Sequence, residues 1–203
     1  VQQVLIYFAA ISLVREKESG RLEEMQSVCK SAPMQVLVKG LVYFLISLLA
    51  WTLCTAIIRW GYQIPMRGDA AVWLAYSSLF LLSIVALGQF FSAIMPNPIL
   101  ATSISLVFTS PSLVLSGYTW PTMALPGIYQ KIGQVFPLTH FVIGYRNVAL
   151  MGCGFAAVKE EMMLLCGIIA VCFALSCIIW HLRLKRIEKK KGTTVQSPAA
   201  LRA

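Results

Sequence analysis

Charged residues are scarce in this sequence: only 12% of its 203 residues are Asp, Glu, Lys or Arg, and 58% are hydrophobic. A soluble domain carries about 25% charged residues. The mean hydropathy is +0.75, so the chain has too few polar side chains to cover a surface that faces water. The composition therefore excludes an ordinary soluble domain and indicates an integral membrane protein.

Several catalytic and metal-binding motifs are also missing. The sequence contains no GxxxxGK[ST] loop to hold the phosphates of ATP, and it has neither a GxSxG nor an HExxH motif. Its six cysteines form no CxxC pair, which argues against a structural metal site. We therefore predict no catalytic residue, no metal site and no cofactor bound by this chain.

Long apolar runs are what the sequence has instead. A helix needs about 20 mainly apolar residues to cross the hydrocarbon core. Four charge-free runs approach or exceed that length, at 41–58, 70–95, 98–118 and 162–180. A fifth, at 1–14, is too short to span alone, and we expect it to end a spanning helix within the C-terminal part of a longer protein. Such runs favour helices over the short alternating strands of a barrel, so we predict an all-α integral membrane protein.

Lys and Arg residues gather on alternate connections between these runs. Twelve of the seventeen lie in 15–40 and in the C-terminal tail, and none lies in 96–98. The other five lie in 59–69 and 119–161. By the positive-inside rule the first set faces the cytoplasm and 119–161 faces outside. We predict that the basic tail at 188–203 is disordered and lies near anionic lipid rather than binding nucleic acid.

A dense block of charge, REKESGRLEEM, occupies positions 15–25 in the first cytoplasmic connection. Leu22, Met25 and Cys29 fall on one side of a short amphipathic helix, which Pro33 is expected to end. The four Glu residues of the block would be repelled by anionic lipid. On composition alone, three surroundings remain open for this helix: another protein, lipid headgroups, or water.

The block resembles the segment that follows the second membrane helix in permease subunits of type-2 ABC exporters, such as the bacterial multidrug and lipid-type permeases. The matching residues are Arg15, Glu16, Glu18, Gly20, Glu23 and Pro33. Arg21 stands where the family prefers Thr. The resemblance implies that 15–33 is a coupling helix, which docks on a separate ATPase subunit. Its coupling residues would be Arg15, Glu16, Glu18, Gly20, Leu22, Glu23 and Met25.

A second stretch, at 115–152, resembles the outer segment between the last two membrane helices of the same family. The matching residues, in order, are Ser116, Gly117, Trp120, Pro121, Pro126, Pro137, Leu138, Thr139, Arg146 and Gly152. Leu125 stands where Met is more usual. The resemblance implies a re-entrant helical hairpin at 119–160 that caps the exit of the translocation path. The residues of this outer gate would be Gly117, Pro121, Pro126, Pro137 and Arg146.

The residues of the outer segment leave two structural alternatives open. The segment is either re-entrant or an ordinary loop folded on the surface, because neither piece beside Pro137 is long enough to span. Arg146 either pairs with a neighbouring helix or a substrate headgroup, or it reaches water as an interfacial side chain. We expect His140 to be a hydrogen-bonded interface residue rather than a ligand or a proton carrier.

The resemblance covers residues from about 13 to 187 and implies a transmembrane domain at 1–187. That domain would hold the last five of six membrane helices, the first of them partial. The implied partners are an ATPase subunit that binds ATP and magnesium, a second permease subunit, either identical or different, and membrane lipid.

The expected function is therefore that of a permease subunit of an ATP-driven exporter in the bacterial cytoplasmic membrane. The apolar runs carry no carboxylate, which argues against coupling to protons or sodium ions. Gln89 is the most polar residue of its run, and we expect it to form a hydrogen bond between helices. The alternatives to transport by an exporter are an integral membrane enzyme that acts on lipid through His140 or Arg146, and a membrane scaffold without transport.

Overall fold

The computed structural model describes residues 2–18, 31–63 and 67–196, and every regular element within them is a helix. The long helices are α1 (Gln2–Glu18), α3 (Ala32–Tyr62), α4 (Ala70–Ile94), α5 (Pro98–Leu115) and α8 (Lys159–Gln196). Between α5 and α8 lie short elements: η1 (Thr122–Ala124), α6 (Gly127–Gly133), α7 (Pro137–Tyr145), the π-helical η2 (Arg146–Leu150) and η3 (Phe155–Ala157). The predicted all-α fold is confirmed.

Four helical segments are long and apolar enough to cross a membrane: Pro33–Tyr62, Ala70–Ile94, Pro98–Leu115 and Lys159–Lys185. Each of them overlaps one of the four full-length apolar runs of the sequence, and the runs at 70–95 and 98–118 end one and three residues beyond their helices. Helix α1 contains a shorter apolar segment, Gln2–Arg15. The chain is therefore a multi-pass membrane protein.

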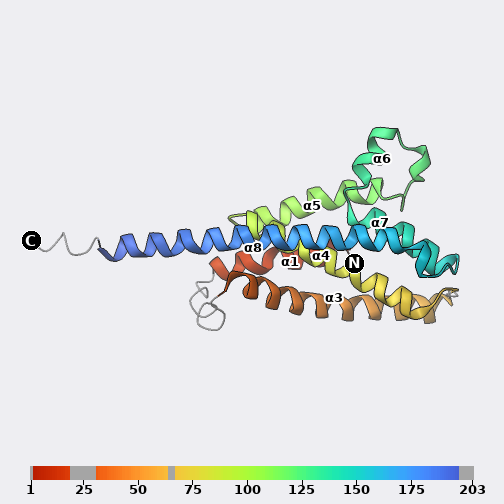
Figure 1. The fold of residues 1–203 in the computed structure, drawn as a ribbon, viewed down its shortest axis with the longest axis horizontal. Coiled ribbons are helices and arrows are strands. Elements are labelled where there is room, and N and C mark those ends of the chain that lie inside the picture. The colour runs from red at the N-terminus through yellow and green to blue at the C-terminus, as the bar shows by residue number, and fades with distance from the viewer. Residues whose placement is uncertain (1, 19–30, 64–66, 197–203) are drawn as a thin grey trace, which may run out of the picture.

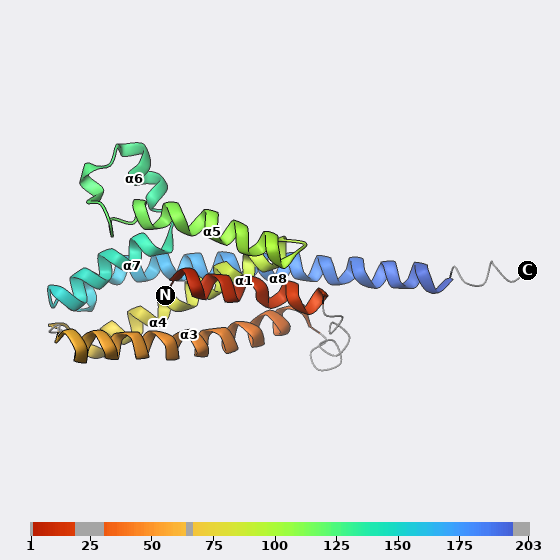
Figure 2. The same cartoon turned by 180° about the vertical axis from the view of Figure 1, so that it is seen from behind.

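The long helices run side by side, and their connections alternate between the two ends of the bundle (Figures 1 and 2). The α4–α5 connection lies at the same end as the C-terminus of α1 and the N-terminus of α3, and α8 extends beyond that end. We call it the coupling end. The segment between α5 and α8 lies at the opposite end, which we call the hairpin end. This grouping of the connections is the one that the Lys and Arg distribution requires.

Helix α4 forms the centre of the bundle. In its most apolar 18-residue window 56% of the residues are buried, against 6% in α3 and 11% in α8. It packs against α1, α3, α7 and α8, and Figure 2 shows α1 between α5 and α3 on one face. A helix that is apolar on all sides suits such a position. The exposed apolar faces of α3 and α8 suit contact with lipid tails.

Small residues let α1 and α4 approach closely. A Cβ atom added to Gly88 of α4 would lie 2.5 Å from the Cβ of Ala9 and 3.0 Å from a backbone oxygen of α1. One turn later, the Ser92 hydroxyl accepts hydrogen bonds from the backbone N–H groups of Leu13 and Val14, at 3.0 and 3.1 Å. Close backbone contact at small residues is the usual way in which membrane helices associate.

Two helices extend further than the apolar runs indicated. Helix α3 begins at Ala32, and Pro33 lies in its first turn instead of ending the preceding segment. Proline is well tolerated there because the first N–H groups of a helix have no partner within it. Helix α8 continues to Gln196, so residues 188–196 are helical rather than disordered. Their Lys and Glu residues are good helix formers, while residues 197–203 lie outside the described part.

Candidate functional site

The predicted coupling residues begin on the last turns of α1. This helix continues to Glu18, so Arg15, Glu16 and Glu18 extend it at the coupling end instead of starting a separate helix. Arg15 is exposed. The remaining predicted coupling residues lie outside the described part of the chain: Gly20, Leu22, Glu23 and Met25. The structure therefore places the two flanks of this segment, α1 and α3.

Hydrogen bonds join both flanks to each other and to the central helix. The Lys39 ammonium of α3 donates to the backbone oxygen of Ser12 in α1, at 3.0 Å. The Gln89 amide of α4 donates to the backbone oxygen of Val36 in α3, at 2.8 Å. The hydrogen bond between helices that we expected of Gln89 is thus confirmed.

Helix α8 is held at the same end by two side chains. The buried Trp180 indole donates to the side-chain oxygen of Gln35, at 2.8 Å. The Arg183 guanidinium donates to the backbone oxygens of Met95, at 2.7 Å, and Ile94. A cation is favourable where α4 ends, because the last carbonyls of a helix lack partners within it. We call Gln35, Gln89, Trp180 and Arg183 the coupling-end cluster.

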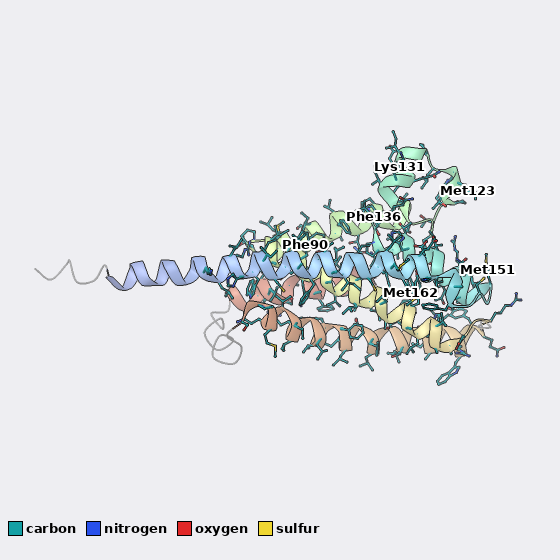
Figure 3. The ribbon with its side chains drawn as sticks, in the orientation of Figure 1. Phe90, Met123, Lys131, Phe136, Met151 and Met162 are labelled. Atoms are coloured by element: carbon teal, nitrogen blue, oxygen red, sulfur yellow. The ribbon has the colours of Figure 1, made fainter. Side chains whose placement is uncertain are left out.

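At the hairpin end, three of the predicted gate residues lie at the starts of helices. Pro121 precedes η1, Pro126 precedes α6, and Pro137 is the first residue of α7. The fixed φ of proline suits these positions. Met123 and Lys131 project away from the bundle (Figure 3), whereas seven of the nine α7 residues are buried. The two arms of the hairpin therefore differ: the first is exposed and the second packs into the protein.

The corner between these arms rests on the end of α5. A Cβ atom at Gly133 would lie 2.9 Å from the backbone oxygen of Leu115. The Thr139 hydroxyl, in the first turn of α7, donates to the backbone oxygen of Gly133 at 2.6 Å. These contacts fix the angle of the hairpin, while its re-entrant position in the membrane stays a prediction.

Arg146 and Gly117, two predicted gate residues, are in direct contact. Gly117 has a φ of 76°, a conformation that favours glycine, and its backbone oxygen accepts a hydrogen bond from Arg146 at 3.0 Å. Arg146 is otherwise exposed, which fits the interfacial alternative. The contact joins η2 to the C-terminal end of α5.

We expect Arg146→Ala to loosen the attachment of this end of α5. The free energy of unfolding should fall by about 1 kcal/mol, the typical net contribution of one hydrogen bond. Hydrogen–deuterium exchange of residues 116–122 should rise, because Gly117 loses its partner. Lys131→Ala removes an exposed charge from the same hairpin and is the matched control. Equal exchange in Arg146→Ala and the unchanged protein would show that the contact does not hold the hairpin.

His140 joins the hairpin to α8. Its Nε2 lies 2.8 Å from the backbone oxygen of Gln134, and its Nδ1 lies 2.5 Å from a carboxyl oxygen of Glu161. The His140 side chain is 7% exposed and that of Glu161 20%. His140 is thus the hydrogen-bonded interface residue that we expected, and neither ring nitrogen is left over for chemistry on a lipid substrate.

The backbone contact of this pair assigns a role to one ring nitrogen. A backbone oxygen only accepts, so Nε2 donates its hydrogen to Gln134. Nδ1 then faces the carboxyl group of Glu161. We call this contact the His140–Glu161 pair.

An aromatic cluster positions α7 on the central helix. Phe141 stacks on Phe80 and Tyr76 of α4, with ring centroids 4.0 and 5.8 Å apart, and meets Trp51 of α3 edge to face at 5.5 Å. The fully buried Tyr76 hydroxyl donates to the backbone oxygen of His140, at 2.5 Å. Aromatic pairs of this kind add to the area that they bury, so α7 is fixed to both α3 and α4.

The end of the α3–α4 connection packs on η2. The backbone N–H of Arg67 donates to the oxygen of Ala149, at 3.2 Å. A Cβ atom at Gly68 would overlap the backbone oxygen of Val148. The hairpin end is therefore one packed unit that includes α3, α4, α5 and α8. Within the described ranges, no three His, Cys, Asp or Glu side chains group closely enough to hold a metal ion.

Sequence reasoning missed Glu161, Tyr76 and most of the coupling-end cluster. Trp180 and Gln35 lie 145 residues apart in the chain, and Glu161 lies 21 residues from His140. No local pattern connects such partners. The one sequence feature that could have drawn attention to Glu161 is its position directly before an apolar run, which becomes the first turn of α8 in the structure.

Residues 2–178 match the family described as ABC-2 family transporter protein. A similar protein of Escherichia coli K12, "Probable multidrug ABC transporter permease YbhS", is 28% identical over 144 residues, which are 70% of this chain and 38% of that protein. "Inner membrane transport permease YhhJ" of the same strain is 25% identical over 199 residues, 95% of this chain and 50% of its own length.

A eukaryotic protein is also similar. "ABC transporter G family member 20" of Dictyostelium discoideum is 28% identical over 150 residues, which are 73% of this chain and 20% of that protein. The chain thus spans half or less of the length of these three relatives.

Proposed function

The chain belongs to the ABC-2 family of transporter proteins, and from this premise we propose that it is the membrane-spanning part of an ATP-driven exporter. It would move a substrate outward across the bacterial cytoplasmic membrane. ATP and magnesium would bind to a separate ATPase subunit, and a second permease subunit would complete the path. The observation that carries the proposal is the family match over 2–178, which includes both the 15–33 segment and the 115–152 stretch.

The packing at the coupling end supports a mechanical role for residues 15–33. The segment is flanked by α1 and α3. Buried hydrogen bonds of the coupling-end cluster join α3 to α4 and to α8, and a half-buried one joins α8 to the end of α4. A displacement of the docked ATPase would therefore reach four helices together. Such coupling requires two arrangements of the membrane helices that ATP binding favours differently.

The hairpin end would form the exit gate. Helix α7 is held to α8 by the His140–Glu161 pair and to α4 by the aromatic cluster, so relative motion of α4 and α8 would be transmitted to the hairpin. Arg146 and Gly117 carry the same motion to α5. In this proposal the permease opens outward when these contacts rearrange.

Charge reversal in the coupling segment tests the proposal. We expect the Glu18→Lys/Glu23→Lys double variant to co-purify with about tenfold less ATPase, because reversed charges face the surface that the carboxylates bind. ATP hydrolysis by the remaining complex should no longer respond to transported compounds. Lys189→Glu/Lys190→Glu, in the basic tail, is the control, because it changes the net charge by the same amount in the opposite direction. Undiminished ATPase binding and response in the first variant would contradict the proposed docking site.

A further inference from the structure

Pro111 interrupts the backbone hydrogen bonds of α5 near the C-terminal end of that helix. Proline has no N–H group, so the backbone oxygen of Val107, four residues earlier, receives no hydrogen bond from it. Membrane helices tolerate an interior proline, and sharp bends in helices occur mainly at such interruptions. Pro111 therefore separates the last turn of α5, residues 112–115, from the rest of the helix.

Two hydroxyl groups directly before the proline weaken the same part of α5. The Thr109 hydroxyl donates to the backbone oxygen of Ser105. The Ser110 hydroxyl donates to that of Leu106, at 2.9 Å. Side chains that donate to the oxygen four residues earlier slightly destabilise a helix and often bend it. Together with the oxygen that the proline leaves free, three successive backbone oxygens have altered hydrogen bonding, so α5 bends most easily at this point.

Ser112, the first residue after the proline, is not matched to its surroundings. Its side chain is fully buried, and its hydroxyl has no hydrogen-bond partner among the described residues. A buried hydroxyl normally has a partner, and one that lacks it calls for an explanation. The last turn of α5 thus leaves a polar group unsatisfied in this conformation, as expected of a segment that has a second arrangement.

The last turn of α5 carries the first arm of the hairpin, residues 118–135. The corner of the hairpin rests on this turn, where a Cβ atom at Gly133 would lie 2.9 Å from the backbone oxygen of Leu115. Hydrogen bonds donated by the Arg146 and Thr139 side chains hold this part of the chain against η2 and α7. A bend at the proline would move the turn and the arm together, and it would break the hydrogen bond from Arg146.

An apolar groove of about 470 Å³ provides the space for such a movement. It lies between α4, α5 and α8, and its lining includes Phe108 of α5, Val135 beside the hairpin corner and Gly167 of α8. A Cβ atom added to Gly167 would meet nothing within 4 Å. Helix α5 diverges from α8 towards the hairpin end (Figures 1 and 2). The last turn of α5 and the corner therefore have room to move towards α8.

We propose that α5 is hinged at Pro111, so that its last turn and the first arm of the hairpin swing as one unit towards α8 and close the groove. In the conformation described above the groove is open and the hydrogen bond from Arg146 to Gly117 is formed. The role of the hinge rests on the proposed function, because it gives the exit gate its moving part. The hinge itself needs neither ATPase nor substrate, so its test can fail independently of that function.

The test measures the distance between two spin labels by electron paramagnetic resonance in the intact permease. One label is attached at Lys131→Cys, on the first arm, and the other at Ile178→Cys, an exposed position of α8, after the native cysteines have been replaced. We expect two populations of distances, of which the shorter belongs to the closed groove. A single narrow distribution would overturn the proposal.

Proline variants locate the hinge. Pro111→Ala restores the N–H group that bonds the oxygen of Val107, so the shorter distance should be lost. Pro98→Ala is the matched control, because Pro98 lies in the first turn of the same helix, where no intrahelical hydrogen bond is missing. It should retain both distances. Two populations in Pro111→Ala in the same ratio as in the unchanged protein would show that α5 does not bend there.

Two further variants test the direction of the swing. Arg146→Ala removes a hydrogen bond that only the open groove allows, so the ratio of the shorter to the longer distance should rise about fivefold. Gly167→Leu fills the groove, so the shorter distance should disappear. Persistence of the shorter distance in Gly167→Leu would overturn the proposed movement towards α8.

Discussion

Replacing Glu161 with alanine is expected to lower the free energy of unfolding by about 3 kcal/mol, the low end of the range for removing one partner of a buried ion pair. The change leaves Nδ1 of His140, whose side chain is 7% exposed, without a partner. It also breaks the contact between α7 and α8. The low end of the range applies because Glu161 keeps 20% of its side-chain surface exposed.

This prediction can be measured by SDS-driven unfolding of the permease in mixed micelles. Cys153, a half-buried free thiol at the hairpin end, provides a local reporter. Its reaction with a maleimide should become faster in Glu161→Ala if the hairpin opens more often. The two readouts together separate a local release of α7 from general loss of the fold.

Glu161→Gln and Glu160→Ala are the matched controls. In Glu161→Gln, the introduced side-chain amide can donate a hydrogen to Nδ1 of His140, so the stability of this variant should remain close to that of the unchanged protein. Glu160 is exposed one residue earlier, and its removal should have little effect. If Glu161→Ala proves as stable as Glu160→Ala, the pair does not hold the hairpin.

Gly88→Leu should lower the free energy of unfolding by a similar amount, roughly 3 kcal/mol, which is the upper end of the usual cost of overpacking. Even its Cβ would lie 2.5 Å from the Cβ of Ala9, and a backbone oxygen of α1 lies 3.0 Å away. The two helices must therefore move apart. Separation also breaks the hydrogen bonds that Ser92 accepts from α1.

Gly167→Leu is the control for this substitution. Gly167 lies within the apolar part of α8, and a Cβ atom there would meet nothing within 4 Å. Unfolding midpoints in SDS should fall for Gly88→Leu and change little for Gly167→Leu. A similar midpoint in both variants would mean that α1 and α4 do not depend on close approach at Gly88.

Hydropathy was enough to locate the membrane helices, because each apolar run is close to the length of about 20 residues that crosses the hydrocarbon core and contains no charged residue. It was less informative about where they begin. The α3 run was cut at Lys39, whose charge ends an apolar window. In the structure Lys39 remains within the helix, because its ammonium reaches the backbone oxygen of Ser12. A contact with α1 thus accommodates Lys39 within α3, whereas the local sequence predicted that the helix starts after it.

The residues of the candidate sites fall into two groups: those that a sequence motif predicted and those that only the structure identifies. Gly117 and Arg146 were predicted from a family motif, and the structure adds that they bind one another. Glu161, Gln35 and Trp180 carry no motif, and their importance depends on partners in other helices. Burial and hydrogen bonding of this kind follow from the packing of helices distant in the chain, which a single sequence does not reveal.

The order of helices along the chain also determines when the coupling-end cluster is completed during synthesis. Helix α3 enters the membrane before α4, so the backbone oxygen that accepts from Gln89 is present when Gln89 arrives. Trp180 and Arg183 belong to α8, the last of these long helices to leave the ribosome. Until then, the Gln35 side chain lacks its indole partner and the end of α4 lacks its guanidinium cap. A nascent chain stalled before residue 180 therefore lacks both of these contacts with α8.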